Sequence, residues 1–552
     1  MSLTFVAFSV LVLFALGYAG YSRFLARKLN LNDAVPTPAC TLNDGVDFVP
    51  APAPFLLGQH FSAIAAAGPI VGPILAGLAY GWLPTLIWIV LGAIFIGAVH
   101  DFSSLVGSVR HRATSVAHLV EEYIGRRAYV LFLVFIWLSL IYVITAFADL
   151  TSSSFAEPAF GGGVAASSLL YILLGVAMGI SMVWFKMPLR WATLIFIPLV
   201  GIAIWLGQKI PVVLPSVAGI RPTLLWDGIL MVYCFVASVL PMWVLLQPRG
   251  YLGGVFLYVS LAAGLVGLAL GGVRVQYPAF IGWTSSAGFP LFPMLFVTVA
   301  CGACSGFHGL VSSGTTSKQV AKESDCRPIG YGAMLLEGLV AVIALATVMM
   351  LSYADPATHL SPDRIYAQGL ASFVRQFGIP SSYAMSFVLL AFATFIFDTL
   401  DVATRLGRYI LQELFGWKGR RGAVAATVAT LALPAWCVTV TMTDAAGKLI
   451  PAWRLFWTLF GTSNQLLAAL TLLGLTTWLR RAGKPWAFAA IPCFFMMTMT
   501  LWALVLLLRG WAVKLSTGGA GFDPVAVASL FLMGLAVMLL AEGLRVLLCT
   551  DP

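Results

Sequence analysis

The sequence has 552 residues, of which 60% are hydrophobic and only 9% are charged, and its mean hydropathy is +0.96. Soluble domains carry roughly 25% charged residues, so the composition excludes a soluble globular protein and indicates an all-α polytopic membrane protein. The net charge of +10 does not indicate a nucleic-acid partner, because the basic residues fall in short loops, as membrane topology requires.

Apolar runs of about 20 residues, long enough to cross a bilayer, recur about fifteen times along the chain. They fall at residues 3–22, 60–80, 84–107, 128–149, 166–184, 190–208, 226–247, 253–272, 291–313, 330–351, 383–406, 423–442, 454–477, 486–508 and 525–547. With the N-terminus outside, the inner loops hold 22 of the 31 Lys and Arg residues. The positive-inside rule therefore favours an outer N-terminus and a cytoplasmic C-terminus.

The second run, 60–80, contains two Gly-Pro pairs, Gly68-Pro69 and Gly72-Pro73. Proline removes a backbone donor and clashes with the preceding turn, and glycine weakens a helix, so the pattern predicts a broken helix. Irregular backbone persists in a membrane only inside a protein or beside a polar cavity, which favours a binding site at the break. The alternative is a proline-kinked helix that packs through small residues.

A second interruption, Ser238-Val-Leu-Pro241-Met-Trp243, falls in the run 226–247, which crosses in the opposite direction. Two interrupted helices would then open two five-helix sets, about 60–208 and 226–406. This arrangement predicts an inverted-repeat transporter with its site between the two breaks. The alternative is that two prolines coincide by chance, since proline is common in membrane helices.

The run 291–313 continues into a hydroxyl-rich segment that ends near Lys318. Ser312 and Ser313 could complete a cation site against the broken helix, or bond back to their own helix. His308 can change charge near neutral pH, so it is a candidate proton carrier as well as a candidate for a structural hydrogen bond.

Charged residues inside membrane helices are costly and are often functional. Glu337 lies within 330–351, and Asp398, Asp401 and Arg405 lie within 383–406. The spacing of four predicts that Asp401 pairs with Arg405. Two acids and one arginine leave one carboxylate over, which could titrate during transport or be hydrogen-bonded.

Cys301-Gly-Ala-Cys304 has the spacing of a redox or metal motif, but it lies in an apolar run without a second ligand pair. We therefore expect small-residue packing, with no metal and no cofactor. Asn464 and Gln465 are predicted to hold helices together. Scattered histidines without HExxH give no support for an intramembrane enzyme.

The longest outer loop, about 353–382, contains Ser361-Pro362, a good start for a helix. Apolar residues then recur at helical spacing and predict an amphipathic helix that covers the outer surface or acts as a lid. These residues are Ile365, Leu370, Phe373, Val374 and Phe377.

Several long motifs resemble the carbon starvation protein A (CstA) family. They are GQHFSAIAAAGPIVGP at 58–73, AVHDF at 98–102, LPMWVLLQPR at 240–249, ACGACSGFHGLVSSGTT at 300–316, IGYGAMLLE at 329–337 and LFGTSNQLLA at 459–468. This chain has Gln59 and His60 where the family has paired histidines. The resemblance implies a transporter of the bacterial inner membrane that takes up peptides or pyruvate, the latter with protons, in the response to carbon starvation. It also implies similarity to the amino acid–polyamine–organocation superfamily, with a LeuT-like core of five plus five helices.

The predicted domains are an N-terminal membrane helix and cytoplasmic linker at 1–52, the inverted-repeat core at 53–410, and peripheral membrane helices at 411–552. We expect import of a small carboxylate or short peptide by alternating access, coupled to H⁺ in preference to Na⁺. The alternative is a nutrient sensor or channel with the same fold. The predicted substrate residues are Gly68, Pro69, Gly72, Pro73, Ser238, Trp243 and His308. The predicted ion-coupling residues are Ala66, His308, Ser312, Ser313, Glu337, Asp398 and Asp401.

Overall fold

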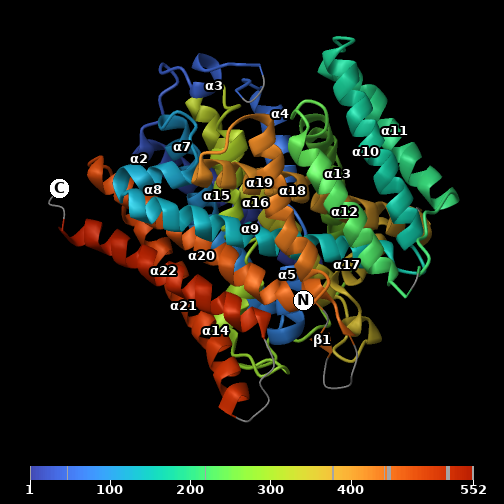
Figure 1. The fold of residues 1–552 in the computed structure, drawn as a ribbon. Helices are drawn as coiled ribbons and strands as arrows, with labels where there is room; N and C mark the ends of the chain where they lie inside the picture. Colours follow the sequence, from blue (N-terminus) through green and yellow to red (C-terminus); the bar gives the residue numbers. More distant parts are fainter. Residues whose placement is uncertain are drawn as a thin grey trace.

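The computed structural model describes residues 2–549 except 46–47, 218, 271, 376–377, 379, 441, 444–448 and 517–522. Nearly all regular structure in this part of the chain is helical, apart from a short antiparallel hairpin of β1 (Met442–Thr443) and β2 (Leu449–Ile450). Two long helices, α9 (Arg126–Phe155) and α18 (Ser381–Phe415), pack against each other near the centre of the bundle (Figure 1). The predicted all-α fold class is confirmed.

The N-terminal helix α1 (Leu3–Leu16) continues through a π-helical turn into α2 (Ser22–Leu29). A linker with the short helix α3 (Pro38–Thr41) follows. The end of this linker runs beside residues 318–320: the Val49 amide donates to the Lys318 carbonyl at 3.2 Å, and the Ala51 amide donates to the Gln319 carbonyl at 2.9 Å. These bonds fix the linker across one end of the bundle.

The first five-helix set opens with a broken helix. Its two halves, α4 (Ala53–Ile64) and α5 (Gly68–Tyr80), meet at an angle of 47°. The prediction that the Gly-Pro pairs interrupt this span is confirmed. The remaining helices of the set are α6 (Trp82–Gly92) with its continuation α7 (Ala98–Arg110), the short α8 (Val116–Tyr123), α9, α12 (Pro222–Val239) and α13 (Leu246–Leu270).

The second set repeats this order of elements. It opens with a broken pair, α14 (Leu291–Thr298) and α15 (Gly306–Val311), and the latter continues into a π-helical turn at Ser312–Thr316. Its other helices are α16 (Ala333–Met349), the short α17 (Pro362–Arg375), α18, α19 (Gly419–Cys437) and α20 (Ala452–Arg481).

Packing relates the two sets as equivalent halves. Helix α9 packs on α18, α12 and α19 each pack on both of these, and α4 packs on α13 as α15 packs on α20. Seven crossings of the described chain, from α4–α5 to α13, precede α14, so the second set enters from the opposite side. The core is therefore an inverted repeat of five plus five helices, as predicted.

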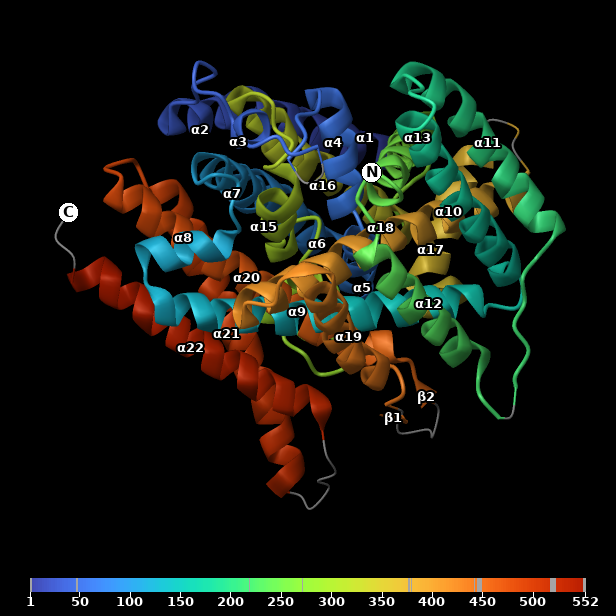
Figure 2. The ribbon, with the colours of Figure 1, turned by 45° about the horizontal axis from the view of Figure 1, so that its top comes forward.

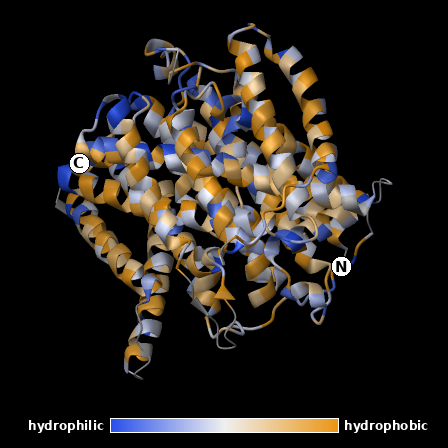
Figure 3. Cartoon of the chain, turned by 45° about the vertical axis from the view of Figure 1, so that its right-hand side comes forward, coloured by the Kyte–Doolittle hydropathy of each residue, from blue (hydrophilic) through white to orange (hydrophobic). Residues whose placement is uncertain are grey.

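The additional helices lie at the edges of the core. The hairpin of α10 (Gly161–Val183) and α11 (Leu189–Lys209) lies on one flank, and α21 (Ala487–Ser516) and α22 (Pro524–Cys549) lie on the opposite flank (Figures 1 and 2). Hydrophobic residues dominate these outer helices (Figure 3). Such surfaces suit contact with lipid.

By length and hydropathy, 12 helices of the described residues could cross a membrane, or 13 if the bent α4–α5 pair is one span. The other two predicted spans, 291–313 and 423–442, correspond to the broken pair α14–α15 and to α19, which do not meet that measure.

The predicted second break was wrong. Helix α12 ends at Val239 and α13 begins at Leu246, so the Ser238–Trp243 segment connects two spans instead of interrupting one. The second interrupted span is α14–α15, broken at residues 299–305. The packing consequently pairs the halves differently from the predicted sets at 60–208 and 226–406.

The predicted amphipathic helix is present as α17, which begins at Pro362. It buries Ile365, Leu370, Phe373 and Val374 against α13, α16 and α18. Phe377 lies outside the described residues. This burial favours structural cover over a lid.

Candidate functional site

The two helix breaks lie against each other. A Cβ atom added to Gly68 would lie 2.4 Å from the Cβ of Cys301, and one added to Gly72 would lie 2.5 Å from the Thr298 carbonyl oxygen. No real side chain tolerates such distances, so glycine is required for this close approach. Within the second break, Gly302 has a φ of +85°, which favours glycine as well.

Side chains from distant helices satisfy the backbone groups that the second break leaves free. The Asn464 side-chain oxygen accepts from the Phe307 amide at 2.9 Å, and its nitrogen donates to the Ser305 hydroxyl at 3.0 Å. The Gln465 side chain donates to the Phe296 carbonyl, and the Trp88 indole donates to the Val299 carbonyl at 3.1 Å. The prediction that Asn464 and Gln465 hold helices together is confirmed.

A first group of buried charged side chains surrounds His308 on α15, and we call it the histidine cluster: His100, Asp101, His308 and Glu337. The His308 Nδ1 lies 2.8 Å from the Asp101 carboxylate, and its Nε2 lies 3.1 Å from the Glu337 carboxylate. The His100 Nδ1 lies 2.8 Å from the other Asp101 oxygen. These side chains are fully buried and connect α7, α15 and α16.

A second group, the arginine cluster, consists of Arg249, Asp398, Asp401, Tyr233 and Ser62. One terminal nitrogen of Arg249 lies 2.7 Å from both Asp398 and Asp401. The Tyr233 hydroxyl donates to Asp401 at 3.0 Å, and the Ser62 hydroxyl donates to Asp398. Ser62 lies on α4, so this cluster links the first broken helix to α12, α13 and α18.

The predicted pair of Asp401 with Arg405 was wrong. Arg405 instead donates to the carbonyls of Ala237 and Leu240, at 2.8 and 2.7 Å, where α12 ends. A cation is favourable at a helix C-terminus because unpaired carbonyls gather there. The spacing of four along α18 placed both side chains on one face, but the carbonyls at the end of α12 offered Arg405 a different partner.

A small cavity of about 20 Å³, enough for about one water molecule, lies between the broken helices and α18. It is lined by Gln59, His60, Ala63, Leu246, Gly250, Val311, Thr315, Thr316, Asp398 and Val402. The His60 Nδ1 lies 2.8 Å from the Thr316 hydroxyl, while its buried Nε2 has no hydrogen-bond partner among the described residues. Asp398 of the arginine cluster and His60, whose Nε2 lacks a partner among the described residues, therefore line the same small cavity.

The structure gathers most of the predicted site residues. Gly68, Pro69, Gly72 and Pro73 lie at the first break, and Ala66 lies within it. His308 and Glu337 meet in the histidine cluster, and Asp398 and Asp401 meet in the arginine cluster. Ser312 is buried and its hydroxyl has no partner among the described residues.

Three predicted site residues, Ser313, Ser238 and Trp243, have positions in which they stabilise the fold. The Ser313 hydroxyl donates to the Gly309 carbonyl at 2.7 Å and accepts from the Val116 amide at 3.2 Å, so it bonds to its own helix and anchors the start of α8. Ser238 lies at the end of α12, with its hydroxyl 3.2 Å from that of Thr427. Trp243 is half-buried in the α12–α13 connection. We place neither Ser238 nor Trp243 at the cavity, because neither lines it.

Arg249 is a residue of the candidate site that the sequence does not predict. The predicted run begins at residue 253, which leaves Arg249 outside the membrane span. Helix α13 begins at Leu246, and the Arg249 side chain is fully buried. Its place in the motif LPMWVLLQPR, directly before a span, was the available signal.

A wider cavity of about 290 Å³, with several charged side chains in its walls, lies at the end of the bundle where α8 lies. Its walls include Arg112, Lys318, His118 and Ser313, and Phe48 of the linker lines it as well. The Lys318 ammonium lies 5.5 Å from the Phe48 ring centre and 5.6 Å from that of Tyr409. Nearby, the Ser324 amide and hydroxyl donate to the Asp33 carboxylate. These hydrogen bonds lower the pKa of Asp33 and fasten the linker to the segment that follows Lys318. We call the cavity of about 290 Å³ the vestibule.

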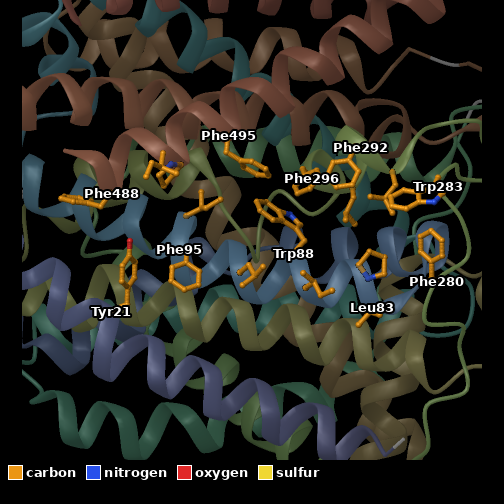
Figure 4. A pocket seen from close by; sticks show the side chains of 18 residues that line it. Tyr21, Leu83, Trp88, Phe95, Phe280, Trp283, Phe292, Phe296, Phe488 and Phe495 are labelled. Carbon is orange, nitrogen blue, oxygen red and sulfur yellow. The ribbon is translucent and has the colours of Figure 1, made fainter. Parts of the chain in front are cut away.

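A third cavity lies apart from both clusters. It is an apolar groove of about 820 Å³ between α6, the α14 segment and α21. Figure 4 shows the aromatic side chains of Trp88, Phe296, Phe495 and their neighbours along it. It is lined almost entirely by hydrophobic side chains, so it does not fit a charged substrate.

Two broken helices that meet at buried charged residues, inside an inverted repeat of five plus five helices, define a secondary active transporter. The chain belongs to the family described as carbon starvation protein CstA, whose model matches residues 1–365 and 354–503. The expected family is thereby confirmed.

Curated relatives are similar over most of their length. The peptide transporter CstA of Helicobacter pylori strain 26695 is 33% identical, over 90% of this chain and 80% of that protein. The pyruvate/proton symporter BtsT of Escherichia coli is 31% identical, over 89% of this chain and 80% of that protein. Among solved structures, MhsT in complex with L-phenylalanine is similar with a TM-score of 0.47 and 15% identity, over 90% of this chain and 98% of that chain.

Proposed function

We propose that the protein imports a small carboxylate such as pyruvate, or a short peptide, together with protons, by alternating access across the bacterial inner membrane. The arginine cluster is the observation that supports this most strongly. Arg249 offers one positive charge to two carboxylates, and all three groups are buried. With both carboxylates ionised, the cluster carries one negative charge more than Arg249 can compensate. A buried charge without a partner is costly, so this excess favours uptake of a proton.

The excess provides a coupling mechanism. When a proton neutralises Asp398 or Asp401, Arg249 loses one of its two anionic partners. A substrate carboxylate can then take that position through a charge-assisted, bidentate hydrogen bond. Proton and substrate stabilise each other in the site, because each compensates the charge of the other. A proton suits this role better than Na⁺, because the side chains form direct ion pairs and the adjacent cavity holds only about one water.

The curated relatives support the substrate class. One is named a peptide transporter and another a pyruvate/proton symporter. Peptides and pyruvate share a terminal carboxylate, which is the group that Arg249 would bind. The vestibule lies next on the path, and its Arg112 and Lys318 would attract the same anion.

We further propose that the N-terminus is outside and the C-terminus is cytoplasmic, as the charge distribution favours. The vestibule and the linker would then face the cytoplasm. We place the transport core at residues 53–481 and not at 53–410, because α19 and α20 belong to the second set. Residues 1–52 and the helices beyond 481 would be peripheral.

Uptake into proteoliposomes tests the proposal. Labelled pyruvate and a labelled dipeptide are offered with an inward gradient of either H⁺ or Na⁺. We expect at least one substrate to accumulate under the H⁺ gradient and not under the Na⁺ gradient. Passive, unsaturable entry would instead indicate a channel, and tight binding without uptake would indicate a sensor.

The Arg249→Lys variant tests the site itself. An ammonium keeps the charge but cannot form the bidentate pair, so we expect uptake to fall by about 10–100-fold, as the loss of about 1.5–3 kcal/mol implies. Arg405→Lys is the matched control, since an ammonium can still donate to the carbonyls at the end of α12. Equal uptake in wild type and Arg249→Lys would refute the assignment.

A further inference from the structure

We propose that Cys301, His308 and Glu337 form a binding site for a transition-metal ion of the Zn²⁺ class. A thiol sulfur, an imidazole nitrogen and a carboxylate oxygen from these residues all lie within 4.8 Å of one another, and all three side chains are buried. Cys301 comes from the second helix break, His308 from α15 and Glu337 from α16. The sequence predicts small-residue packing for Cys301, because Cys301-Gly-Ala-Cys304 lies in an apolar run without a second ligand pair.

The three donor atoms converge on one point between the second break, α15 and α16. The His308 Nε2 makes an ion-pair contact of 3.1 Å with a Glu337 oxygen, but this nitrogen has no well-aligned hydrogen bond among the described residues. Buried polar atoms without partners are rare and call for a physical reason. Two donors about 2.1 Å from one tetrahedral zinc ion lie about 3.4 Å apart, close to the separation observed.

The surroundings orient His308 as a metal ligand. Its Nδ1 donates to Asp101 at 2.8 Å, and His100 bonds to the other Asp101 oxygen. A carboxylate behind the histidine fixes its tautomer and leaves the Nε2 lone pair free for a metal. The Nε2 lone pair faces the Glu337 carboxylate, so either a second proton on the imidazole or a metal cation lies between them.

The ligand set selects the class of metal. A thiolate, an imidazole and a carboxylate suit zinc or a similar first-row ion and do not suit Mg²⁺ or Ca²⁺, which prefer oxygen ligands. The Asn464 side-chain nitrogen lies 3.4 Å from the Cys301 sulfur and would stabilise a thiolate. Three protein ligands leave one tetrahedral position open, which is typical of sites where ligands exchange.

Such an ion would link three elements that must move apart during transport. It would connect the second break to α15 and α16, beside the contact of Cys301 with Gly68. Bound Zn²⁺ would therefore arrest the transport cycle. This consequence rests on the proposed transport function, whereas metal binding itself does not.

Metal binding is tested on the full-length protein in detergent, stripped with a chelator and incubated with Zn²⁺ or Co²⁺. We expect one Zn²⁺ per chain and, with Co²⁺, the absorption of a sulfur-to-cobalt charge transfer. Cys301→Ser should lose that absorption, and Cys301→Ser and Glu337→Gln should each bind Zn²⁺ at least about 100-fold more weakly. Cys304→Ser, which changes a buried thiol three residues away, should bind as the wild type does.

Wild-type protein that elutes as a single species but binds no Zn²⁺ would overturn the proposal, since the position would then take a proton only. Unchanged binding in Cys301→Ser, or equal loss in Cys304→Ser, would overturn the ligand assignment. Where a variant fails to fold, the cobalt spectrum of the wild type still reports whether a thiolate is bound. Uptake is measured separately with and without Zn²⁺, so failure of transport leaves the binding result intact.

Discussion

At the residue scale, the site depends on atoms that approach more closely than side chains normally allow. The carbonyl oxygen of Thr298 occupies the space where a Cβ of residue 72 would lie, at 2.5 Å. Because this neighbour is backbone, it cannot move aside as the end of a flexible side chain could. Gly72 therefore sets how closely α5 can approach the second break.

We expect Gly72→Ala to destabilise the protein by about 1–3 kcal/mol, the usual cost of overpacking, and to reduce uptake. Thermal unfolding in detergent and uptake in proteoliposomes would measure both effects. Gly58→Ala is the matched control on α4: its Cβ would lie 3.7 Å from Tyr258, which is ordinary contact. It should be neutral or stabilise the helix by up to about 1 kcal/mol. A Gly72→Ala variant as stable and active as Gly58→Ala would show that the close approach is dispensable.

The sequence predicted which ionisable residues belong to the site better than it predicted their ion-pair partners. The cost of burying charge predicts Glu337, Asp398 and Asp401, and the titration range of histidine predicts His308; all four meet buried partners. The partner of both aspartates, Arg249, lies about 150 residues away and could not be found from spacing along one helix. The sequence shows which buried charges need an ion-pair partner, whereas the tertiary packing determines which residue becomes that partner.

At the element scale, the two breaks differ in how far the sequence reveals them. The first contains two Gly-Pro pairs, which interrupt a helix wherever they occur. The second, at 299–305, contains no proline, and its free backbone groups are satisfied by Asn464, Gln465 and Trp88 from other helices. Without those contacts the run 291–313 appears to be one apolar helix, so the break was missed.

Asn464→Leu tests whether α20 holds this break open. The change keeps the volume but leaves the buried Phe307 amide without its acceptor, which costs about 1–3 kcal/mol. We expect a lower unfolding temperature in detergent and slower uptake. Thr471→Val on the same helix is the control, because the buried Thr471 hydroxyl has no partner among the described residues, so its loss should be neutral or stabilising. If both variants behave alike, Asn464 does not support the break.

At the scale of the whole molecule, the inverted repeat was predictable from alternating topology, whereas its register was not. The additional α10–α11 hairpin lies between the third and fourth helices of the first set and shifts every later span by two positions. Counting five spans from the first break therefore led to α12 instead of α14–α15. Only the packing of α9 on α18 shows which helices are equivalent.

The proposed transport path requires the vestibule to open and close, and Phe48 of the linker lines this cavity. A double variant, Ala51→Cys with Val320→Cys, joins two residues that pair in a short parallel bridge. Neighbouring strands lie close enough for a disulfide. We expect oxidation to stop uptake and a reductant to restore it, measured in a Cys40→Ser background because Cys40 is exposed close to Ala321. The Ala51→Cys single variant should not respond to oxidant. Full uptake by the cross-linked protein would show that the linker stays in place throughout the cycle.

The α10–α11 hairpin also makes the two halves of the transporter unequal. The Tyr171 hydroxyl on α10 donates to the Arg249 carbonyl at 2.7 Å, and Gly175 lies so close that a Cβ there would be 3.1 Å from the Arg249 Cβ. The second set joins α18 directly to α19 through residues 416–418, without such a hairpin. The outer helices beside the second set, α21 and α22, instead follow its last helix, so only the first set places an inserted hairpin directly against the buried Arg249.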